Sequence, residues 1–167
     1  MNKAVLLSGS NTGDLSRNME CALTMMAQYA GDIKNKSFIY ETEAWGKIDQ
    51  PAYYNQVIEL NTYLDAHTLM QKLLQIEKMM GRERTEKWAP RLIDLDILYF
   101  NNEVINEPDL KIPHPHLHER RFTLAPLSEI LPDMIHPILK RSNKDLLDSL
   151  TDTLKVRVLN SQSDVKQ

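Results

Sequence analysis

The segment IDLDILY at residues 93–99 most constrains the fold, because aliphatic side chains alternate in it with carboxylates. Successive side chains of a strand point to opposite faces of a sheet, so the alternation predicts a strand with one apolar face. Asp94 and Asp96 would share the other face, about 6.6 Å apart at ~3.3 Å per residue. Two carboxylates this close repel each other, and burying one alone is costly. The pattern therefore predicts positive charge beside this strand.

The composition limits the class of protein. A length of 167 residues fits one domain, expected at residues 1–160, with the polar residues 161–167 as a disordered tail. The formal net charge of −3 argues against sequence-independent binding of nucleic acid, so any basic site must be a local cluster. The single cysteine excludes an internal disulfide, and no apolar run reaches the ~18 residues of a membrane span. A cytoplasmic monomer without a nucleic-acid or membrane partner is expected.

Apolar periodicity predicts both strands and helices. Strands are expected at residues 4–8, 36–44, 53–64 and 93–99, which are rich in aliphatic and aromatic residues. Helices are expected between Asp14 and Gly31 and between Asp65 and Gly81, where apolar residues recur at three- and four-residue spacing.

The order of these elements predicts the fold class. A hairpin turning at Asn101 and Asn102 follows the acidic strand, and a helix and a possible strand follow near the end of the chain. The resulting order of strand, helix, strand, strand, helix, strand, strand suggests a ferredoxin-like arrangement. The expected fold is α+β, a largely antiparallel sheet with helices packed on it in three α/β/α layers.

Methionines recur on the apolar sides of both expected helices, at Met19 and Met26 in the first and at Met70 and Met80 in the second. Such stripes are more often core packing than a cofactor site, because the flexible thioether fills irregular gaps. Cys21 lies on the apolar side of the first helix and is expected in the core as well.

Asp94 and Asp96 have two interpretations. They can form the solvent-facing side of an edge strand, where carboxylates only keep the surface soluble, and the local pattern leaves this open. They can also hold a hard cation, because magnesium prefers oxygen ligands and commonly takes one or two carboxylates together with substrate phosphates. In the second interpretation the pair resembles the metal anchors of phosphoryl-transfer enzymes.

Cationic segments bracket the acidic strand. Arg82, Arg84, Lys87 and Arg91 precede it, and Arg120 and Arg121 follow it. These cations can simply pair with Glu83 and Glu86 on a solvated loop, but guanidinium forks also match phosphate oxygens with paired hydrogen bonds. Together with two acids on a strand, they favour a magnesium–nucleotide site. The motif G-x-x-x-x-G-K-[ST] is absent from the sequence, so a P-loop fold is not expected.

The segment HPHLH at residues 114–118 carries three alternating histidines. His114, His116 and His118 could ligate zinc or manganese, but a metal site made only of histidines is the less favoured interpretation. The favoured one is that His114 donates a hydrogen bond to a phosphate oxygen, while the other two lie on the surface.

Four separated stretches of the chain carry a recognisable pattern. They are GSN at 9–11, DQPAYYNQV at 49–57, GRERTEKWAPRLIDLDIL at 81–98 and IPHPHLHERRFTLAPL at 112–127. Together they resemble the 6-hydroxymethyl-7,8-dihydropterin pyrophosphokinase family of folate synthesis. The resemblance implies that the chain transfers a pyrophosphoryl group from ATP to the hydroxymethyl group of a reduced pterin and releases AMP.

The resemblance also implies roles for individual residues. Asp94 and Asp96 correspond to the ligands of two magnesium ions, and Arg82 and Arg91 to loop arginines that stabilise the charge developing on the phosphates. The ATP side is implied to include Gln75, Glu77, Arg84, Trp88, Ile97, His114 and Arg120. The pterin side is implied to include Thr42, Trp45, Gly46, Tyr53, Asn55 and Phe122.

The residue types fit a flat pterin on their own terms. Phe122 and Tyr53 offer aromatic faces, and Asn55 offers an amide to a polar edge that would cost ~1–3 kcal/mol if buried unpaired. Two other classes stay open: a non-catalytic ferredoxin-like module that senses a metal–nucleotide, and an interaction domain whose charged loops contact an acidic partner. A sensor needs no second flat site, so the aromatic and amide group favours the enzyme.

Overall fold

An antiparallel sheet forms the centre of the computed structural model, which describes residues 1–42, 52–81, 92–152 and 155–159. Its strands are β1 (Asn2–Ser10), β2 (Asp32–Lys36), β3 (Ile39–Thr42), β4 (Tyr53–Thr62), β5 (Asp94–Phe100) and β8 (Val156–Leu159). The strand order is β5-β1-β4-β3-β8, with β2 also beside β4, and every pairing is antiparallel. The shorter strands β6 (Ile105–Glu107) and β7 (Leu110–Ile112) form a separate hairpin.

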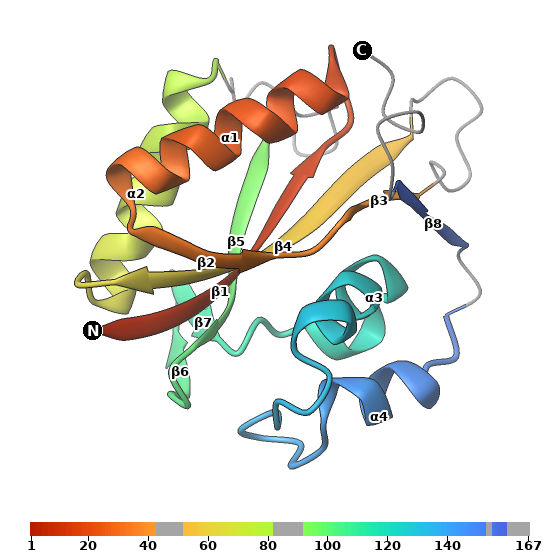
Figure 1. Cartoon of the computed structure of the whole chain (residues 1–167). Helices are drawn as coiled ribbons and strands as arrows, with labels where there is room; N and C mark the ends of the chain where they lie inside the picture. Colours follow the sequence, from red (N-terminus) through yellow and green to blue (C-terminus); the bar gives the residue numbers. More distant parts are fainter. Residues whose placement is uncertain (43–51, 82–91, 153–154, 160–167) are drawn as a thin grey trace.

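Helices cover both faces of this sheet (Figure 1). Helices α1 (Leu15–Tyr29) and α2 (Ala66–Met79) lie side by side on one face. The other face carries α3 (Arg121–Ile130), with α4 (Asn143–Asp148) packed against it. A 3-10 turn, Leu117–Glu119, leads into α3. The three-layer α+β prediction is therefore confirmed. None of the helices in the described ranges combines the length and the apolar character needed to cross a membrane.

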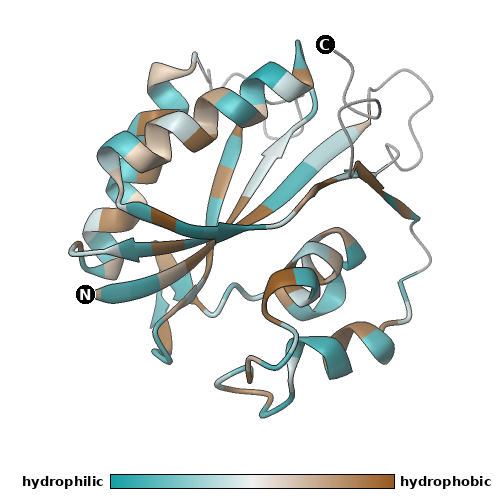
Figure 2. Cartoon of the chain, viewed as in Figure 1, coloured by the Kyte–Doolittle hydropathy of each residue, from teal (hydrophilic) through white to brown (hydrophobic). Residues whose placement is uncertain are grey.

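Each face of the sheet has its own apolar cluster. Leu6 and Ile58 of the sheet pack with Met19 and Met26 of α1 and Leu73 of α2. On the opposite face, the cluster joins sheet residues to α3 and α4, and its members include Leu7, Val57, Tyr99, Leu124, Leu127 and Leu146. Figure 2 shows hydrophobic and hydrophilic residues interleaved along α1, as a helix covering a sheet on one side requires. The core role predicted for the methionine stripes is confirmed, because Met70 and Met80 also pack against the first cluster.

Both long helices begin at the expected residues. Asp14 accepts a hydrogen bond from the backbone N–H of Arg17 at 3.2 Å, and Asp65 accepts one from Thr68 at 2.8 Å. Such caps satisfy N–H groups that the first helical turn leaves without a partner. Gly81, with φ of +90°, follows the end of α2, as expected for a residue that reverses out of a helix.

Three sequence predictions were wrong in detail. The chain turns at Asn101 and Asn102, but the expected hairpin with the acidic strand does not form, because β6 pairs with β7 and not with β5. The strand expected at 36–44 begins earlier and is split, because the hydroxyl of Ser37 accepts the Val57 N–H at 3.0 Å, where a continuous strand would offer a carbonyl. Cys21 is exposed rather than buried. The buried positions of α1 include Met19, Ala22 and Met26, and Cys21 lies about 200° around the helix from Met19 at ~100° per residue. Cys21 is thus close in sequence to the buried positions of α1 but lies on the opposite side of the helix.

His136 anchors the segment that leads from α3 to α4. Its imidazole is 3% exposed and lies edge-on to Tyr99, with 5.8 Å between the ring centroids. Nδ1 accepts backbone N–H bonds from Ile138 at 3.2 Å and Leu139 at 3.0 Å, so the neutral ring carries its proton on Nε2. Burial, and to a lesser degree the charge of His118, lowers the pKa of His136 to about 4.

This buried imidazole predicts that acid destabilises the fold. Between pH 6.5 and 4 the unfolded chain binds a proton at His136 that the folded chain does not, so the free energy of unfolding falls as pH falls. His136→Asn should reduce this dependence by up to roughly 3 kcal/mol over that range, because the Asn Oδ1 can accept both backbone bonds and does not titrate. Urea unfolding at a series of pH values measures the slope. An unchanged slope in the variant would contradict the assignment.

Candidate active site

The register of β1 brings residues from three strands into one row. Gly9 of β1 pairs with Asp94 of β5 on one side and with Asn55 of β4 on the other. Residues directly opposite each other in neighbouring strands point to the same face of a sheet. Two residues further along β1, Leu7 pairs with Asp96 and with Val57, and packs into the cluster beneath α3. The two aspartates and Asn55 therefore share the α3 face of the sheet.

A buried carboxylate from α2 supports the strand that carries the aspartates. Glu77 is 3% exposed and accepts the backbone N–H of Leu95, the residue between Asp94 and Asp96, at 2.7 Å. In the part of the sheet that is described, β5 is an end strand, so this N–H has no neighbouring strand to bond. Glu77 thus holds the acidic strand in place through a hydrogen bond from α2.

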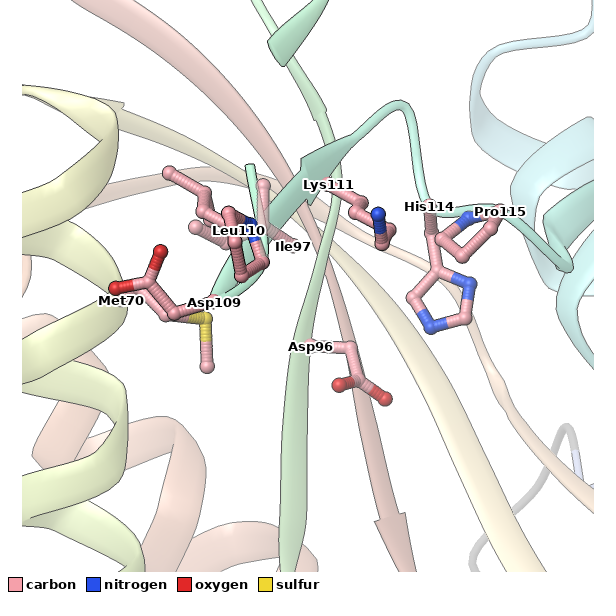
Figure 3. A pocket seen from close by; sticks show the side chains of 9 residues that line it. Met70, Asp96, Ile97, Asp109, Leu110, Lys111, His114 and Pro115 are labelled. Atoms are coloured by element: carbon pink, nitrogen blue, oxygen red, sulfur yellow. The ribbon is translucent and has the colours of Figure 1, made fainter. Parts of the chain in front are cut away.

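A pocket of about 250 Å³ lies beside β5 at this edge of the sheet. Its lining comes from α2, β5 and the β6–β7 hairpin with the segment after it, and consists of Met70, Asp96, Ile97, Pro108, Asp109, Leu110, Lys111, His114 and Pro115. Figure 3 shows Met70, Ile97 and Leu110 gathered at one side, and the carboxylate of Asp96 and the imidazole of His114 at the other. The pocket thus combines an apolar part with acidic and basic groups.

His114 is held as a neutral hydrogen-bond donor. Its backbone N–H bonds the Leu98 carbonyl at 3.0 Å, which fixes the segment against β5. Its Nδ1 accepts the His116 N–H at 3.1 Å, so the proton of the neutral ring is on Nε2. Burial lowers the pKa of His114 to about 4, assisted by the charges of Arg120 and His116 and opposed by Asp94. These couplings place His114 in the electrostatic field of both the acidic strand and the start of α3.

Arg120 and Phe122 stand at the start of α3. The Arg120 guanidinium lies 5.5 Å from the centroid of the Phe122 ring, a cation–π contact. Phe122 is half-buried and packs against the cluster between α3 and the sheet. Both residues therefore belong to the face that carries the aspartates.

On the β4 side of Gly9, polar groups of β3 and β4 lie close to this row of residues. Thr42 pairs with Tyr53, and Tyr40 pairs with Asn55. Thr42 is 2% exposed, and its hydroxyl has no hydrogen-bond partner among the residues that the structure describes. Asn55 is 5% exposed, whereas Tyr53 is 39% exposed. A buried hydroxyl without a partner is costly, which favours a polar ligand beside it.

The structure brings together only part of the predicted site. Gln75 is exposed on α2 and does not line the pocket. Predicted residues outside the described ranges are Arg82, Arg84, Trp88, Arg91, Trp45 and Gly46. His116 and His118 bond or approach Glu119, at 2.9 and 3.6 Å. Within the described ranges, no group of three or more His, Cys, Asp or Glu side chains could hold a metal ion.

Sequence reasoning missed several residues that line the pocket. Met70 was assigned to the core, which it also contacts, and Leu110 and Lys111 were assigned no role. The available signal was the short hairpin directly before HPHLH, since a turn that returns the chain to the acidic strand must lay its own side chains beside that strand.

The support of Glu77 for β5 can be tested by truncation. Glu77→Ala leaves the buried Leu95 N–H without its acceptor, so the free energy of unfolding should fall by about 1–3 kcal/mol. Glu77→Gln keeps an oxygen at the same reach and should lose less. Denaturant unfolding of both variants gives the comparison, and equal losses would show that the hydrogen bond is not what the carboxylate contributes.

The structure is that of a ferredoxin-like α+β protein with a pocket at the acidic edge of its sheet. The model of the 7,8-dihydro-6-hydroxymethylpterin-pyrophosphokinase family matches residues 5–132. The chain belongs to this family, and the family prediction made from the sequence is confirmed.

Individual relatives agree with the family model. One relative is the 2-amino-4-hydroxy-6-hydroxymethyldihydropteridine pyrophosphokinase of Bacillus subtilis. The two sequences are 38% identical over 99% of this chain and 95% of the relative. For the protein of the same name from Aquifex aeolicus the identity is 39%, over 82% of this chain and 85% of the relative. The HPPK-DHPS crystal structure of Plasmodium falciparum has the same fold, with a TM-score of 0.73 at 20% identity over 89% of this chain. The match spans 43% of that longer chain.

Proposed function

We propose that this protein transfers the pyrophosphoryl group of ATP to the hydroxymethyl oxygen of 6-hydroxymethyl-7,8-dihydropterin, as a step in folate biosynthesis. The hydroxyl oxygen attacks the β-phosphorus and its proton is released to solvent, while the bond from that phosphorus to the oxygen bridging to the α-phosphorus breaks and AMP leaves with that oxygen. The observation that carries the proposal is the position of the acidic pair. Asp94 and Asp96 lie between a pocket at the edge of the sheet and a second set of recognition residues on β3 and β4.

The pocket beside β5 is the proposed binding site of ATP. An adenine base would rest on the apolar side formed by Met70, Ile97 and Leu110. Its phosphates would then extend toward the basic groups, where Lys111 offers charge and His114 a neutral Nε2–H donor. Arg120 adds a guanidinium, whose fork matches phosphate oxygens.

Asp94 and Asp96 suit magnesium. The donor set is two carboxylates on one strand face, which matches an ion that keeps water and takes its remaining ligands from phosphates. Bound ions, two of them by analogy with the family resemblance, would neutralise the triphosphate and align the attacking and leaving oxygens. Phosphoryl transfer gives a protein little covalent chemistry to do, so positioning and charge compensation are the main contributions of this chain.

The pterin would lie over the other end of the row. Phe122 and Tyr53 supply aromatic faces for the flat ring. The Asn55 amide and the Thr42 hydroxyl, which belong to buried residues, can satisfy the polar edge of the ring. Other residues belong to the proposal on the evidence of the sequence alone. They are Trp45 and Gly46 on the pterin side, and Arg82, Arg84, Trp88, Arg91 and Gln75 on the ATP side.

The products of the reaction test this function. Protein incubated with magnesium, ATP and 6-hydroxymethyl-7,8-dihydropterin should form AMP in equal amount to the pterin pyrophosphate, as chromatography of the nucleotides and pterins would show. ADP as the nucleotide product, or tight nucleotide binding without turnover, would point to an ordinary kinase or to a sensor instead.

Removing either charge of the acidic pair tests the metal assignment. Asp94→Asn and Asp96→Asn keep the side-chain volume, and each should lower kcat by more than ~100-fold, because a metal clamp contributes several kcal/mol at ~1.36 kcal/mol per tenfold. Cys21→Ser is the control, since Cys21 is exposed on α1 and should leave turnover unchanged. Near-normal turnover in both aspartate variants would refute the assignment.

A further inference from the structure

Gly9 occupies the middle of the row of functional residues. Asp94 flanks it in β5 and Asn55 flanks it in β4. With ~4.8 Å between neighbouring strands, the backbones of Asp94 and Asn55 are roughly 10 Å apart, and the residue between them has no side chain. We propose that Gly9 is a positioning residue: its missing Cβ lets the Asn55 amide lie over β1, where a side chain at position 9 would displace it. This inference rests on the proposed pyrophosphokinase function.

The space above Gly9 is already taken by Asn55. A Cβ built on Gly9 would lie 2.9 Å from Asn55 Oδ1 and 3.9 Å from its Cγ, whereas the nearest backbone atom, the Tyr54 carbonyl oxygen, is at 3.6 Å. The short contact is with the end of a side chain, so a methyl group at this position would displace the amide and not the sheet. The side chain that would have to move is buried, since Asn55 is 5% exposed.

The backbone on either side of Gly9 is fixed from the opposite face. Ser8 lies against Met19 of α1, with 3.8 Å between the Ser8 hydroxyl oxygen and the Met19 sulfur. Ser10 accepts a hydrogen bond from the Asn18 amide at 3.0 Å and donates one to the Leu92 carbonyl. Since these contacts and two neighbouring strands hold β1, the crowding caused by a side chain at position 9 is transmitted to Asn55.

The position of the Asn55 amide matters for the reaction because of what this residue is proposed to hold. With the pterin recognised by Asn55 and the pyrophosphoryl group held near Asp94, the hydroxymethyl oxygen and the β-phosphorus would approach each other on the face of the sheet that these two residues share with Gly9. A methyl group at position 9 would move the pterin-binding amide, while the nucleotide pocket at the outer edge of β5 would keep its shape. Gly9 thus sets the fit of the pterin and leaves ATP binding alone.

Gly9→Ala, combined with Asn55→Ala in a double-mutant cycle, tests this inference. In the otherwise unchanged chain, Gly9→Ala should weaken pterin binding by about tenfold, the equivalent of one misplaced hydrogen bond. The affinity for a non-hydrolysable ATP analogue should change less than about twofold, because the atoms nearest to a Cβ at position 9 belong to Asn55 and Tyr54 and not to residues that line the pocket beside β5. In the Asn55→Ala background, where the obstructing amide is gone, Gly9→Ala should have little further effect on pterin affinity.

Thermal unfolding of the same four proteins without substrate separates this inference from the proposed function. Gly9→Ala should lower Tm in the wild-type background and lower it less in the Asn55→Ala background, whether or not the protein makes AMP. If Gly9→Ala lowered Tm equally in both backgrounds, or if the double variant did not fold, the clash would be with the backbone and the inference would be overturned. Equal weakening of ATP and pterin binding would also overturn it. Absence of AMP formation by the wild type, with the Tm coupling intact, would overturn the function alone.

Discussion

The antiparallel pairing of β1 with both β4 and β5 is the constraint on which the site depends. It sets Asp94, Gly9 and Asn55 side by side and points both aspartates to the face beneath α3. A slip of one residue in either pairing would turn the whole acidic or amide set to the other face, into the apolar cluster of α1 and α2. The aliphatic residues that alternate with the functional ones prevent this slip. Leu95, for example, is 1% exposed on the far side of the sheet. The packing of the apolar core therefore fixes the strand register, and the register determines which residues face the site.

The electrostatics of the site follow from its position at the end of the sheet. The acidic strand is neither fully buried nor fully solvated: Asp94 and Asp96 are partly exposed, and the residues between and after them are buried. Nearby, burial keeps His114 neutral, so the imidazole contributes a directed N–H donor without adding charge. Permanent charge is left to Arg120 and Lys111, whose side chains extend from the segments flanking β5. A triphosphate with bound cations needs this combination of fixed donors and compensating charge.

Much of the fold could be predicted from the sequence, because period and capping are local properties. The strands at 4–8, 53–64 and 93–99 and both long helices follow from side-chain periodicity, and Asp65 and Gly81 mark the ends of α2. The features that could not be predicted depend on tertiary contacts. The break between β2 and β3 requires the Ser37 hydroxyl to reach the Val57 N–H. Cys21 is exposed because of how α1 is turned about its own axis, and the apolar pattern does not fix that orientation to within one residue. The pocket joins Met70 to Leu110 and Lys111, and no local pattern relates residues so far apart.

The outer edge of β5 has a consequence beyond substrate binding. An end strand whose backbone groups are unpaired can recruit a strand from another molecule and start aggregation. Here the Leu95 N–H is taken by the Glu77 carboxylate, and the Leu98 carbonyl is taken by the His114 N–H. Carboxylates at positions 94 and 96 add repulsion between any two copies that approached edge to edge. The hydrogen bonds of Glu77 and His114 that hold β5 beside the pocket thus also occupy backbone groups through which a strand of another molecule could extend the sheet.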